Sequence, residues 1–84
     1  MKVEFRSAAQ KALRRLPSER RRQIVMRIAT VASAGVGSAD VRRLAGSDLY
    51  RLRVGDYRVL FTIDPGKEVL TVDLVRTRGD VHKR

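Results

Sequence analysis

The C-terminal half of the chain contains three stretches rich in β-branched and aromatic residues, and these predict β-strands. Two short segments separate the stretches, Gly55-Asp56 and Asp64-Pro65-Gly66-Lys67, and both are typical of hairpin turns. The pattern therefore predicts an antiparallel meander with strands at Leu49–Val54, Tyr57–Ile63 and Glu68–Val75.

The N-terminal half has apolar positions at helical spacing instead. A first helix is predicted before Pro17, and a second follows it with one apolar stripe at Ile24, Val25, Ile28, Ala29 and Ala32. Residues 2–6 alternate as a short strand does, and residues 32–39 read as a loop. We expect an α+β fold, β-α-α-β-β-β, with an antiparallel sheet packed against an N-terminal helical hairpin in a single domain spanning residues 1–84.

A two-residue turn between the first two strands fixes which residues face each other. One side of this hairpin is apolar and is assigned to the core, with Tyr50 facing Phe61 and Leu52 facing Val59. The other side carries three arginines, so we predict that they converge on one outward surface: Arg51, Arg53 and Arg58. The alternative is that the arginines lie apart in solvent and that their stems cover an apolar neighbour.

If the second turn also has two residues, the register of the second hairpin follows in the same way. It places Asp73 opposite Arg58 and Leu74 in the core. Alternation along the strand also sends Arg76 to the core side, so a functional Arg76 requires the strand to end or bulge near Val75.

The composition is strongly basic. Nineteen Lys and Arg residues against nine Asp and Glu residues give a formal net charge of +10, and 15 of the basic residues are Arg. The planar guanidinium group binds phosphate through two parallel hydrogen bonds, so we predict a nucleic acid or an acidic protein as partner. The alternative is that the arginines reflect codon usage and solvated helix faces.

Several kinds of site are excluded by the residue types. The chain has no cysteine for a disulfide, a thiolate zinc site or a nucleophile, and it has one histidine. Its carboxylates are scattered singly, so we expect no metal and no cofactor. No apolar run approaches the roughly 20 residues of a membrane helix, and we expect a cytoplasmic protein with no membrane partner.

RNA can be cleaved without a metal when a 2′-hydroxyl attacks the adjacent phosphate. This chemistry needs a base, an acid for the leaving group and cations around the phosphorane, which arginines with one His or Tyr could supply. His82 is the only side chain whose unperturbed pKa lies near neutral, although it could equally be a solvated residue in a frayed tail. A DNA-binding module is less favoured, because no helix combines Asn, Gln and Arg on a recognition face.

Two segments closely resemble the RelE/ParE toxin superfamily of bacterial type II toxin–antitoxin systems. They are Leu49–Phe61, LYRLRVGDYRVLF, and Val75–His82, VRTRGDVH. The N-terminal strand, the helix ending in Leu-Pro and the longer second helix are similar as well, so the resemblance covers nearly the whole chain. It implies a toxin that is neutralised by a cognate antitoxin, whose disordered segment folds over the toxin.

In the RelE branch, the resemblance implies a metal-independent mRNA endonuclease that acts in the ribosomal A site and inhibits translation. The implied catalytic set is Arg51, Arg58, Arg76 and His82. Arg58 and Arg76 would stabilise phosphate charge, and Arg51 would have a tuning or positioning role. His82 stands where the family usually has tyrosine and would stack on a base or exchange protons. The remaining basic positions assigned to RNA or ribosome binding are Arg53, Arg78, Lys83 and Arg84.

The ParE branch is the alternative. The resemblance implies that it shares the fold, inhibits DNA gyrase by binding and lacks nuclease activity. The complete set of arginines in this chain favours the RelE branch, with the ribosome and mRNA as partners in place of gyrase.

Overall fold

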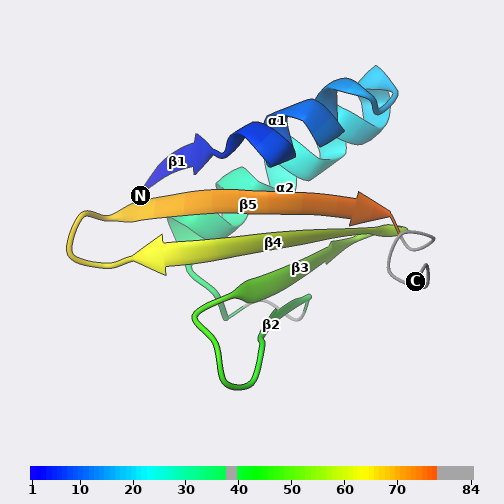
Figure 1. Cartoon of the computed structure of the whole chain (residues 1–84). Coiled ribbons are helices and arrows are strands. Elements are labelled where there is room, and N and C mark those ends of the chain that lie inside the picture. Colours follow the sequence, from blue (N-terminus) through cyan, green and yellow to red (C-terminus); the bar gives the residue numbers. More distant parts are fainter. Residues whose placement is uncertain (38–39, 78–84) are drawn as a thin grey trace.

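The computed structural model describes residues 1–37 and 40–77. Its elements in chain order are β1 (Lys2–Phe5), α1 (Ser7–Arg14), α2 (Ser18–Ala34), β2 (Val41–Arg43), β3 (Tyr50–Val54), β4 (Tyr57–Asp64) and β5 (Val69–Thr77). The strands form one sheet in the order β1-β5-β4-β3-β2, shown in Figure 1. The predicted α+β fold is confirmed, with the short strand β2 added to the predicted elements.

The sheet is mixed. β3, β4 and β5 pair antiparallel, as predicted, and the additional strand β2 pairs antiparallel with β3. β1 instead runs parallel to β5, from Lys2↔Val69 to Phe5↔Val72. The two helices provide the length of chain needed to pass from β1 at one edge of the sheet to β2 at the other (Figure 1). No helix in the described part of the chain is long and apolar enough to cross a membrane.

Both helices pack against one face of the sheet, and their buried side chains join those of the strands in a single core. Every buried residue among residues 1–37 and 40–77 is apolar. The largest fully buried side chains come from α2 and from three central strands: Phe61, Ile24, Ile28, Leu52, Leu70, Val59 and Val72.

The buried stripe of α2 is narrower than predicted. Ile24 and Ile28 are buried, together with two residues one turn further along, but Val25 is 40% exposed and Ala29 is also exposed. Each of these two residues follows a buried isoleucine directly, and one residue rotates the helix by about 100°. That rotation carries both side chains off the face that meets the sheet.

The register of the β3–β4 hairpin is confirmed in all five pairs, from Tyr50↔Phe61 to Val54↔Tyr57. Gly55 has a φ of +59°, which suits the first central position of a type II′ turn. On the core side the rings of Tyr50 and Phe61 stack, with their centroids 5.4 Å apart. The two-residue turn therefore sets the two faces of this hairpin.

The β4–β5 hairpin differs from the prediction in its turn and in its register. Pairing begins at Asp64↔Val69, so the turn has four residues instead of two. The register then shifts between the pairs Phe61↔Val72 and Leu60↔Leu74, which leaves Asp73 as the extra residue of a β-bulge.

Beyond this bulge the alternation of β5 is reversed relative to the predicted one. Arg76 faces Arg58, and Leu74 faces Leu60 on the side away from the helices. The predictions that Asp73 lies opposite Arg58 and that Leu74 belongs to the core were therefore wrong. The requirement for a bulge was correct, although β5 continues past it to Thr77.

The turn between β4 and β5 places a residue other than glycine in the left-handed region, since Glu68 has a φ of +55°. Glu68→Gly is expected to raise the free energy of unfolding by roughly 0.5–1 kcal/mol, because glycine adopts this conformation without a Cβ clash. The hydrogen bond from the Lys2 N–H to the Glu68 carbonyl, 2.9 Å long, involves only backbone and is retained.

Urea denaturation of the two proteins measures this difference, with Lys67→Gly as the control in the same turn. Lys67 does not have a positive φ, so glycine there should lower stability through the greater entropy of the unfolded chain. Destabilisation by both substitutions would contradict the prediction.

Candidate nucleic-acid interface

The face of the sheet away from the helices carries arginines from four neighbouring strands. Arg53↔Arg58 and Arg58↔Arg76 are direct cross-strand pairs in one row, and Arg42↔Arg51 is a pair in the next row. Residues that face each other across a sheet lie on the same side. We call this surface the arginine face and define it by Arg42, Arg51, Arg53, Arg58 and Arg76.

The guanidinium groups of the arginine face have no hydrogen-bond or ion-pair partner among residues 1–37 and 40–77. Arg51 and Arg58 are half-buried and the other three are exposed. Like charges directly opposite one another destabilise a sheet by a few tenths of a kcal/mol to about 1 kcal/mol per pair. A bound polyanion would turn this repulsion into attraction, since each guanidinium retains its full capacity to donate hydrogen bonds.

An ion pair at the end of β1 anchors the bulge that positions Arg76. The Arg6 Nε donates to Asp73 Oδ1 at 2.6 Å, and the Asp73 side chain is 18% exposed. The Arg6 backbone N–H also donates to the Val72 carbonyl at 2.9 Å. Arg6 thus holds the bulge through the side chain of Asp73 and through the carbonyl of the residue before it. The reversed alternation after the bulge brings Arg76 opposite Arg58.

The structure brings together four of the residues that the sequence assigned to the site. Arg51, Arg58 and Arg76 lie on β3, β4 and β5, and Arg53 lies beside them on β3. The other assigned residues lie outside the described residues: Arg78, His82, Lys83 and Arg84. The catalytic and binding roles of both groups stay predictions.

Sequence reasoning missed Arg42. It lies on β2, which has only three residues and carries a single β-branched side chain, so its pattern is too short to predict a strand. Its pairing with Arg51 is what places it on the arginine face. Among residues 1–37 and 40–77, no three His, Asp or Glu side chains gather where they could hold a metal ion.

A sheet with a helical hairpin on one face and arginines on the other is what the resemblance to RelE/ParE toxins led us to expect. The model of the family described as the ParE toxin of the type II toxin–antitoxin system parDE matches residues 3–81. The chain therefore belongs to this family and is a type II toxin of the RelE/ParE superfamily.

Solved structures agree with this assignment. A chain of the archaeal RelE–RelB complex from Pyrococcus horikoshii OT3 is 30% identical, with 93% of this chain and 94% of that chain covered and a TM-score of 0.81. A chain of the intact Escherichia coli RelBE toxin–antitoxin complex is 25% identical, with 90% of this chain and 94% of that chain covered and a TM-score of 0.78.

The YoeB/ParE toxin from Agrobacterium tumefaciens is 14% identical, with 92% of this chain and 98% of that chain covered and a TM-score of 0.78, which is a likeness of fold alone. No curated protein sequence matches the chain significantly.

Proposed function

We propose that this toxin is a ribosome-dependent mRNA endonuclease that is neutralised by a cognate antitoxin. The observation that carries the proposal is the placement of Arg51, Arg58 and Arg76 on three adjacent strands of one helix-free face. These are three of the positions at which the RelE resemblance implies catalytic residues. The 30% identity to a chain of an archaeal RelE–RelB complex supports the same branch.

The proposed reaction needs no metal. The ribose 2′-oxygen forms a bond to the adjacent phosphorus, the bond from phosphorus to the 5′-oxygen breaks, and the products carry a 2′,3′-cyclic phosphate and a 5′-hydroxyl. The proton leaves the 2′-oxygen for a base, and the 5′-oxygen receives one from an acid. Arg58 and Arg76, which face each other, would donate to the phosphoryl oxygens as negative charge builds up on them.

His82 would take part in proton transfer or stack on a base. Arg51 faces Leu60. Arg58 lies two residues before Leu60 on the same side of β4, so Arg51 would position the message beside the reacting phosphate. The antitoxin would inhibit the enzyme by covering the arginine face or by displacing the segment that carries His82.

Primer extension on programmed ribosomes with an open A site tests the proposal. Purified toxin should produce cuts at the A-site codon only when ribosomes are present. A message with a 2′-deoxynucleotide at the cut position should stay intact, because the attacking hydroxyl is missing. Cleavage of that deoxy message, or of free RNA at the same rate, would contradict the proposed mechanism.

Inhibition of DNA gyrase is the second candidate, and the match to the ParE family model is the observation that favours it. In that case the arginine face would bind a protein instead of RNA. Growth arrest without A-site cuts, together with loss of supercoiling by gyrase in the presence of toxin, would establish this candidate in place of the first.

A further inference from the structure

The arginine face extends beyond the predicted catalytic set to the edge of the sheet. Arg42 lies on the edge strand β2 directly opposite Arg51. Together with Arg53 and Asp40, these two residues line a hollow of about 90 Å³. Three arginines therefore line one small concavity on the face proposed to bind RNA.

The single carboxylate that lines this hollow is already engaged elsewhere. Asp40 Oδ2 accepts a hydrogen bond from Arg27 Nη2 at 2.7 Å, and the Asp40 carbonyl accepts one from the Arg53 backbone N–H at 3.1 Å. The Asp40 carbonyl thus binds the backbone of Arg53, while the Asp40 carboxylate is neutralised by Arg27 of helix α2. The guanidinium groups of Arg42 and Arg53 keep their positive charge uncompensated by any described carboxylate.

The β2 side of the hollow, where Arg42 lies, is distant from the pair that would hold the reacting phosphate, whereas Arg53 on its other side faces Arg58 directly. Neighbouring strands lie roughly 4.8 Å apart, so β2 and β5 are separated by three such spacings, about 14 Å. A phosphate between Arg58 and Arg76 therefore leaves Arg42 free to contact a different one. The row that begins with Arg42 and Arg51 continues across β4 and β5 with two apolar residues, Leu60 and Leu74.

We propose that Arg42, together with Arg51 and Arg53, forms a second phosphate-binding subsite, which holds a neighbouring phosphate of the RNA backbone beside the one that is cleaved. The proposal rests on the proposed function, and Arg42 is in it a binding residue with no part in the chemistry. Guanidinium groups suit a phosphodiester because their forked donors match its two free oxygens. The subsite would align the message along the sheet from its β2 edge toward the Arg58–Arg76 pair.

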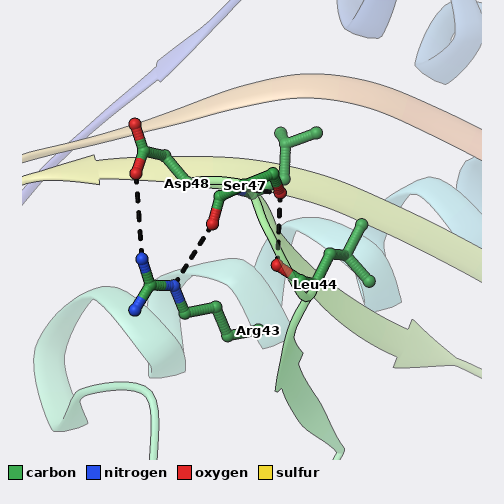
Figure 2. A network of polar contacts seen from close by, with 5 residues as sticks. Arg43, Leu44, Ser47 and Asp48 are labelled. Atoms are coloured by element: carbon green, nitrogen blue, oxygen red, sulfur yellow. Dashed lines mark hydrogen bonds and ion pairs between the residues drawn. The ribbon is translucent and has the colours of Figure 1, made fainter.

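The neighbouring residue Arg43 provides a matched control. Like Arg42, it is a positively charged, exposed residue of β2. It faces Tyr50, however, and so lies on the opposite side of the strand. Figure 2 shows its guanidinium turned toward the turn before β3, where Nε donates to the Ser47 carbonyl at 3.3 Å and Nη2 lies 3.8 Å from Asp48 Oδ1. Arg43→Gln removes the same charge as Arg42→Gln without touching the proposed subsite.

Fluorescence anisotropy with a labelled single-stranded RNA, without ribosomes, tests the subsite directly. Arg42→Gln should weaken binding by about 5- to 10-fold near 50 mM salt. It should also reduce the slope of log affinity against log salt by about 0.7, the value for one lost phosphate contact on a single strand. Arg43→Gln should leave that slope unchanged. Equal effects of the two substitutions would show a response to net charge alone and would overturn the proposal.

Cleavage on ribosomes separates this proposal from the proposed function. Arg42→Gln should raise KM several-fold and leave kcat within twofold of the unsubstituted toxin, whereas a loss confined to kcat would overturn the subsite. If the unsubstituted toxin cuts no message but the difference in salt slope remains, the proposed function fails and the subsite stands. If Arg42→Gln leaves RNA binding intact and weakens only the antitoxin complex, the hollow belongs to the antitoxin and the proposal is wrong.

Discussion

Arg58→Gln is expected to lower mRNA cleavage by about 100- to 1,000-fold, the usual effect of removing one preorganised donor from a site of developing charge. Arg58 lies in the middle of its row, between Arg53 and Arg76, and is half-buried on the central strand β4. Glutamine keeps much of the stem but cannot supply the charge. Single-turnover cleavage on programmed ribosomes measures the loss.

The same substitution is expected to leave the fold intact and to raise the free energy of unfolding by a few tenths of a kcal/mol to about 1 kcal/mol. The reason is that Arg58 faces a like charge on each side, and both repulsive pairs disappear with it. Urea denaturation should therefore show the opposite sign from the cleavage assay. Stability and activity are opposed at this position because the charges that would bind phosphate repel each other in its absence.

Arg20→Gln is the control, since Arg20 is exposed on α2 and carries the same charge. It should change neither cleavage nor stability appreciably. Cleavage by Arg58→Gln within a few-fold of the unsubstituted toxin would remove Arg58 from the site. Equal losses in both variants would mean that net charge, rather than the position of Arg58, controls the activity.

Phe61→Ala is expected to have the largest effect on stability, a loss of about 3–5 kcal/mol. Phe61 is 1% exposed, and its ring stacks on Tyr50 on the core side of the sheet. A chain of this size has a free energy of unfolding of only about 4–13 kcal/mol, so the variant should be marginally folded or unfolded at 37 °C. Urea and thermal denaturation measure the change.

Met26→Ala is the matched control, because Met26 is an apolar residue that is 62% exposed on α2. Its truncation should change stability by no more than about 0.5 kcal/mol. If the proposed antitoxin binds only the folded toxin, it should restore the fold of the Phe61→Ala variant by mass action. A loss below about 1 kcal/mol for Phe61→Ala would contradict the assignment of this residue to the centre of the core.

The parts of the fold that the sequence predicted correctly are those fixed by local geometry. Gly55-Asp56 allows a two-residue turn, and that turn determines every pair of β3 with β4. The second turn contains a favourable Pro65-Gly66 pair inside a four-residue loop, in which Glu68 takes the left-handed conformation. No propensity rule places glutamate there, so a register derived from the favourable pair was wrong.

For the candidate site, too, the sequence predicted only what local geometry determines. Arg51, Arg53 and Arg58 could be grouped from the first hairpin alone, whereas the side occupied by Arg76 depends on a bulge at Asp73. Asp73 has no local sequence signal for a bulge, because its partner Arg6 lies 67 residues away in the chain. Tertiary contacts of this kind decide the faces of β5, and they cannot be read from a window of a few residues.

The bulge also makes β5 tolerant of a change in length at one position. Since Asp73 has no partner on β4, a chain lacking it would join Val72 directly to Leu74 in a regular ladder. Arg76 would still face Arg58, and both faces would keep their side chains. Loss of a residue elsewhere in the strand would instead transfer side chains between the core and the solvent. Related toxins can therefore differ by one residue in this strand and still present the same arginines.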